Sequence, residues 1–87
     1  MTQSGLRNPC DMLKEAITFI KKDIAAKEAR IEVLTGRLQN LQDQQNPDLD
    51  QIAETQADIK ELETQLASDR PQLNAFEEEF AAVCGPT

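Results

Sequence analysis

The chain has 87 residues, enough for one small domain, and it contains 16 acidic residues, 9 basic residues and no His, Trp or Tyr. Its net charge of −7 opposes binding to nucleic acid or to an anionic membrane surface, and no apolar run approaches a membrane span in length. Because Ala, Leu, Gln, Glu and Lys are common and β-forming residues are few, we expect an all-α protein.

The first residues are polar and show no periodicity, so we expect a disordered tail over residues 1–8. They also lack the apolar core of a signal peptide, which favours a cytoplasmic protein. Asn8-Pro9 then predicts a helix start, because Asn8 can cap a helix with its side chain and Pro9 suits the first helical position.

Beyond Pro9, seam residues recur at alternating steps of three and four, the a/d pattern of a coiled coil. We predict one helix over about residues 9–44. Its seam residues are Cys10, Leu13, Ile17, Ile20, Ile24, Lys27, Ile31, Leu34, Leu38 and Leu41.

Asn46-Pro47-Asp48 predicts a turn over residues 45–47. Pro47 cannot continue the first helix but can open a second one, with Asn46 or Asp48 as the cap. We predict the second helix over about residues 48–84, ended by Gly85-Pro86, with Gly85 as a left-handed cap residue. Its seam residues are Ile52, Thr55, Ile59, Leu62, Leu66, Asp69, Leu73, Phe76, Phe80 and Val83.

The short turn requires the two helices to lie antiparallel. Facing seam residues then have numbers that add up to 93, as Leu41 and Ile52 do, and the two seams match over their whole length. The sequence therefore predicts a two-helix antiparallel coiled-coil hairpin over residues 9–85.

Pro71 interrupts the second helix, because it removes the backbone hydrogen bond to the carbonyl of Ala67. The seam continues in phase beyond it, which favours a continuous helix with a kink near Pro71. A break into two helices is the alternative, since Ser68 and Asp69 are good caps.

Cys10 and Cys84, the only cysteines, fall at the same end of the predicted hairpin. A disulfide would close a loop of 74 residues and favour a secreted or periplasmic protein. Two free thiols remain an alternative, and a redox pair is a weaker one because the chain has no C-x-x-C spacing. The compartment stays unassigned.

Lys27 and Asp69 are the two charged residues in the seams, and they fall in adjacent layers. A pair of opposite charges at such positions fixes the register of the helices more than it stabilises them. A polar binding pocket is the alternative.

Charge is divided unevenly between the helices. Residues 9–45 carry six positive and six negative charges, whereas residues 46–84 carry two and ten. We expect Lys14 to face Glu77 and Arg37 to face Asp58 across the hairpin. The acidic face also includes Glu54 and Glu61; it is either a solvated surface or a docking surface for a basic partner.

A second apolar stripe runs along the outer side of the first helix. It consists of Met12, Phe19, Ala26 and Val33, seven residues apart, with Ala16 between the stripe and the seam. The matching side of the second helix offers Ala75 and Ala82. A two-helix hairpin cannot bury this stripe, so it predicts an interface, either with a second copy to give a four-helix bundle or with another helical protein. Incidental exposure is the third interpretation.

Nothing in the sequence indicates an enzyme, a cofactor or a metal site, because the chain has no His, Tyr or Gly-rich loop. We therefore predict a non-catalytic protein–protein interaction or assembly module, most simply a homodimer, with no nucleic-acid partner. The alternative is a small acidic inhibitor or immunity-like protein that binds a basic partner through its second helix.

Overall fold

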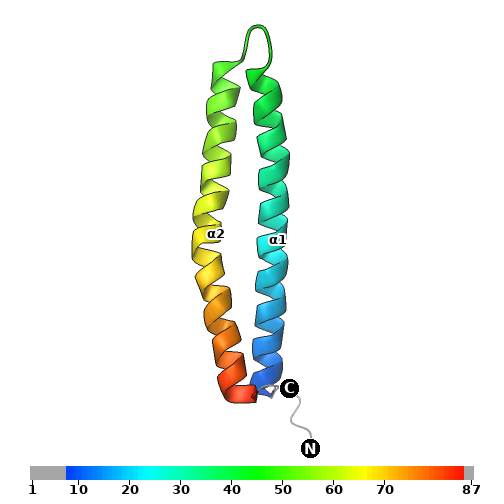
Figure 1. The fold of residues 1–87 in the computed structure, drawn as a ribbon, viewed down its shortest axis with the longest axis vertical. Coiled ribbons are helices and arrows are strands. Elements are labelled where there is room, and N and C mark those ends of the chain that lie inside the picture. Colours follow the sequence, from blue (N-terminus) through cyan, green and yellow to red (C-terminus); the bar gives the residue numbers. More distant parts are fainter. Residues whose placement is uncertain (1–7, 86–87) are drawn as a thin grey trace, which may run out of the picture.

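The computed structural model describes residues 8–85 and contains two helices in this range. Helix α1 spans Pro9–Gln42 and helix α2 spans Leu49–Cys84. They pack against each other side by side, joined by a turn at one end, with the start of α1 and the end of α2 together at the other (Figure 1). The predicted antiparallel hairpin is confirmed. The predicted tail over residues 1–8 lies outside the described residues, except for Asn8.

Both helices begin at a side-chain cap. The Asn8 Oδ1 atom accepts a hydrogen bond from the Cys10 N–H at 2.7 Å, and Pro9 occupies the first helical position. The Asp48 Oδ1 atom accepts one from the Gln51 N–H at 3.1 Å. Asp48 is therefore the cap of α2, and Pro47 precedes the helix rather than opening it.

The connection between the helices is longer than predicted, because α1 ends at Gln42 rather than near residue 44. Asp43 closes the helix with its N–H bonded to the Gln39 carbonyl at 3.0 Å. A proline disfavours helical backbone in the residue before it, here Asn46. The chain must also cross the distance of about 8–10 Å between the two helix axes. The predicted turn of three residues would span this distance only with a strained backbone.

Helix α2 runs unbroken through Pro71, so the predicted alternative of a break is wrong. Pro71 is exposed on the side of α2 away from the seam. The missing hydrogen bond therefore lies on the solvent side of the helix. Backbone hydrogen bonds on that side are longer when a helix curves around a core, so the loss is tolerated there. The ribbon of α2 is concave toward α1 (Figure 1), and a sharp kink at Pro71 stays a prediction. Gly85 ends the helix with φ 75° and ψ 165°, a positive φ that favours glycine but not the left-handed helical conformation that we predicted.

The seam of α1 is confirmed at every position, since all ten of its residues are buried or half-buried. The seam of α2 is confirmed except at its end, where Val83 is 56% exposed. Cys84 takes the inner position because it is bonded to Cys10. Adjacent residues point about 100° apart on a helix, so turning Cys84 inward turns Val83 to the surface.

The core is a single row of side chains. Ile24, Leu34, Leu41 and Leu66 are buried, with Leu66 only 2% exposed. Thr55 is the one buried polar residue in the described range, and its hydroxyl donates to the Gln51 carbonyl at 2.8 Å. A core this thin contributes little stability, so covalent and ionic links between the helices gain importance.

Candidate interaction surface

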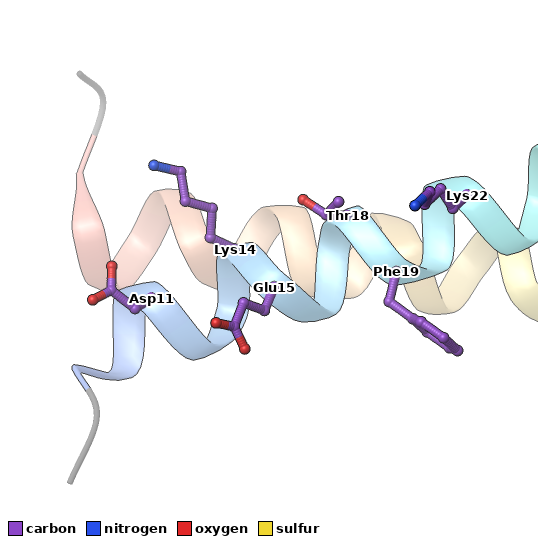
Figure 2. A pocket seen from close by; sticks show the side chains of 6 residues that line it. All are labelled: Asp11, Lys14, Glu15, Thr18, Phe19 and Lys22. Atoms are coloured by element: carbon purple, nitrogen blue, oxygen red, sulfur yellow. The ribbon is translucent and has the colours of Figure 1, made fainter. Parts of the chain in front are cut away.

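The apolar stripe on α1 lies at the surface of the hairpin. Met12 is 55% exposed, Phe19 70% and Val33 61%, and Ala26 is also exposed. Phe19 projects from α1 away from α2, next to Glu15 and Lys22 of the same helix (Figure 2). The seven-residue spacing places these side chains on one face of α1, about 130° from the seam.

An apolar groove extends this surface at the cysteine end. Pro9, Met12, Leu13 and Ala16 of α1 line one side, and Phe76, Glu79 and Val83 of α2 line the other. The Glu79 carboxylate is the only charged group in the lining. Val83, which was predicted in the seam, instead joins Met12 as an exposed apolar residue. The inward turn of Cys84 to Cys10 accompanies this shift.

The two alanines predicted on α2 are exposed but do not line this groove. Ala75 and Ala82 lie on the outward side of α2, next to the side that carries Glu79. An alanine side chain has a single carbon, so these residues add little apolar surface. Both helices therefore contribute to the apolar surface only in the groove at the cysteine end.

The cysteine end is closed by a covalent bond between the helices. Cys10 and Cys84 form a disulfide with Cα atoms 5.8 Å apart, as predicted from their positions. In the chain-entropy description, closing a loop of 74 residues stabilises the fold by about 4.5 kcal/mol. The disulfide therefore holds together the end of the hairpin that carries the groove.

The two charged seam residues meet in the middle of the hairpin. The Lys27 ammonium donates a hydrogen bond to the Asp69 carboxylate at 2.7 Å, and both side chains are 20% exposed. A third group, the Asp23 carboxylate, lies 2.9 Å from the same ammonium. These hydrogen bonds, the one to Asp69 first, raise the pKa of the Lys27 ammonium above its usual 10.5. The three charged groups therefore pair with one another, and no buried side-chain nitrogen or oxygen in the described part of the chain lacks a hydrogen-bond partner.

Two exposed ion pairs cross the seam on its other flank. The Lys21 ammonium lies 3.5 Å from the Glu77 carboxylate, and the Arg70 guanidinium donates to Glu28 at 2.8 Å. The expectation that Lys14 would face Glu77 is therefore corrected: Lys21 pairs with it, because a long side chain reaches a partner one turn away. Exposed pairs of this kind each contribute well under about 1 kcal/mol.

The acidic face near the turn is exposed, as predicted. Asp58 and Glu61 line an open groove whose other lining residues are Arg30, Leu34 and Leu62. The predicted pairing of Asp58 with Arg37 is not among the ion pairs of the described residues. Glu61 accepts a hydrogen bond from Gln65 at 3.1 Å.

Glu54 is exposed as well.

The described residues present no arrangement suited to holding a metal ion, since no three carboxylate or thiol groups cluster within them. Over residues 8–85, neither helix is long and apolar enough to cross a membrane. The features with the clearest chemical character are the exposed apolar stripe and the groove that continues it.

Comparison with known proteins adds no assignment: no family model, curated protein or solved structure matches this chain.

Proposed function

We propose that this protein is a non-catalytic assembly module that associates with a second copy of itself through the stripe on α1. The observation that carries the proposal is the exposure of Phe19, Met12 and Val33 on one face of a single helix. Leaving three large apolar side chains in water loses the free energy that their burial would provide, about 1.5–3 kcal/mol for each if fully buried. Large apolar side chains that recur on one exposed face of a helix are typical of an interaction site.

A second copy suits this surface for a reason of symmetry. A two-fold axis sets the same apolar stripe of each copy against that of the other, so one surface serves both partners. The result is an assembly of four helices, two from each hairpin. Because the core of one hairpin is thin, the apolar area that each copy covers on the other would add to the stability of both.

The second candidate function is an acidic inhibitor that acts through α2. It is supported by ten acids against two bases in residues 46–84 and by the exposure of Glu54, Asp58 and Glu61. It ranks second because exposed carboxylates are ordinarily solvated and require no partner, whereas a row of exposed apolar side chains does not have this explanation. An inhibitor of this kind would work as a monomer, which separates the two candidates.

Light scattering on three proteins tests the proposal. The wild type is expected to show a mass that rises with concentration, and Phe19→Ser is expected to remain a monomer. The matched control is Leu49→Ser, because Leu49 is 74% exposed but lies beside the turn, outside the stripe. It should associate as the wild type does. A wild type that is monomeric at every concentration would overturn the proposal and favour the inhibitor.

A further inference from the structure

We infer that the two copies associate antiparallel, α1 against α1, with Phe19 of each copy at the two-fold axis. This inference rests on the proposed function and specifies the geometry of the interface. An antiparallel pairing centred on Phe19 places Met12 of one copy opposite Ala26 of the other, twice. A large side chain then faces a small one at both positions, which is how packed interfaces fill space.

The charges beside the stripe favour this pairing. Glu15 and Lys22 are seven residues apart, so helix periodicity places them on the same flank of the stripe, one before Phe19 and one after it. In the antiparallel pairing, Glu15 of each copy faces Lys22 of the other. Two ion pairs of opposite charge then lie symmetrically about the axis.

The other flank of the stripe offers no conflict. There Asp23 would face Ala16 of the second copy, and its carboxylate is already held by Lys27 at 2.9 Å. No two groups of like charge are brought face to face on either flank.

A shift of the pairing by one heptad loses this complementarity. The shifted pairing places Phe19 of one copy opposite Ala26 of the other and Met12 opposite Val33, so it uses the whole stripe. It also places Lys22 of one copy opposite Lys22 of the other, and Asp23 opposite Asp23. Like charges directly opposite one another destabilise an interface. The distribution of charge therefore selects the pairing centred on Phe19, which leaves Val33 outside the overlap.

The size of this contact predicts a reversible dimer. The overlap involves about 20 residues of α1, a length of about 30 Å, on a helix about 10 Å wide. The buried area is then below the roughly 1,000 Å² that stable interfaces bury, so the association should depend strongly on concentration.

Charge exchange tests the pairing by sedimentation equilibrium. Glu15→Lys places the new ammonium group of each copy opposite Lys22 of the other copy, on both sides of the two-fold axis. Lys22→Glu places the new carboxylate of each copy opposite Glu15 of the other. Each single variant is expected to raise the dimer dissociation constant about tenfold at low salt. The double variant carries both changes, restores opposite charges and is expected to return to within about threefold of the wild type. Lys60→Glu, an exposed charge reversal on α2, is the control for net charge and should leave the constant nearly unchanged.

The outcomes separate this inference from the proposed function. If the wild type dimerises and Phe19→Ser does not, the proposed function holds whatever the charge variants show. If Glu15→Lys then dimerises as tightly as the wild type, the antiparallel pairing is overturned, because in a parallel pairing Glu15 faces Ala16 and Lys22 faces Asp23. Failure of the double variant to recover would overturn it too. Circular dichroism of each variant checks that the helices are intact.

Discussion

The Lys27 ammonium of α1 contacts the Asp69 carboxylate of α2 at 2.7 Å, within a seam whose other buried residues are aliphatic or Thr55. Sliding one helix past the other would leave each charge against an apolar layer without its partner. Such an unpaired charge is costly, whereas the pair itself adds little net stability. We infer that Lys27 and Asp69 fix the register of the hairpin.

Replacing both charges is therefore expected to be harmless. Lys27→Leu with Asp69→Leu should leave the free energy of unfolding equal to that of the wild type or higher. Lys27→Leu alone should lower it by about 1–3 kcal/mol, because the half-buried Asp69 carboxylate loses its hydrogen bond. Thermal unfolding followed by circular dichroism measures both, and a large loss in the double variant would contradict the register interpretation.

Alkaline pH should weaken the same cluster. The pKa of Lys27 is raised in the folded protein by its bonds to Asp69 and Asp23, so folding favours the protonated ammonium. This contribution is fully present below the unfolded-state pKa of about 10.5 and is lost as the pH rises through the higher folded-state value. Denaturant unfolding over a pH series from 9 upward should show no loss from this group at pH 9 and a growing loss in the wild type above about 10.5. Lys27→Met is the control, and an equal loss in this variant would assign the effect to other groups.

Removing the disulfide should destabilise the hairpin substantially. The paired change Cys10→Ser and Cys84→Ser is expected to lower the free energy of unfolding by about 4.5 kcal/mol, because the unfolded chain gains freedom. A reducing agent should have the same effect on the wild type and none on the serine variant. An unfolding midpoint that reduction leaves in place would show that the bond contributes nothing.

Pro71→Ala should stabilise α2. The carbonyl of Ala67 regains its backbone partner, a gain of up to about 3 kcal/mol. Pro47→Ala is the matched control, since Pro47 precedes the cap; it should be neutral or slightly destabilising because the unfolded chain becomes more flexible. Loss of stability in Pro71→Ala would mean that the curvature at Pro71 is needed to bring Cys84 to Cys10.

The seams could be predicted from the sequence because heptad spacing decides which side of a helix is buried. The same spacing placed Lys27 near Asp69 and Cys10 near Cys84. Three features escaped it. Asp23 joins Lys27 from outside the a/d positions, so seam periodicity does not include it. Val83 turns outward only because Cys84 is tied inward. Lys21 rather than Lys14 reaches Glu77 because side-chain length, not layer number, sets that partner.

The outward stripe of α1 was also visible in the sequence, but one chain cannot show what covers it. Exposure of Phe19 in the hairpin is the condition for an interface and does not by itself identify the partner. The opposite charges of Glu15 and Lys22 supply the further argument for a second copy, because an antiparallel pairing centred on Phe19 sets each of them against the other.

The most direct test is the amide NMR spectrum of the labelled wild type over a dilution series. Self-association through the stripe predicts shifts that depend on concentration, are centred on Phe19 and fade toward the turn, with little change on the acidic face around Asp58 and Glu61. A spectrum that does not change with concentration, or changes confined to α2 near the turn, would contradict it.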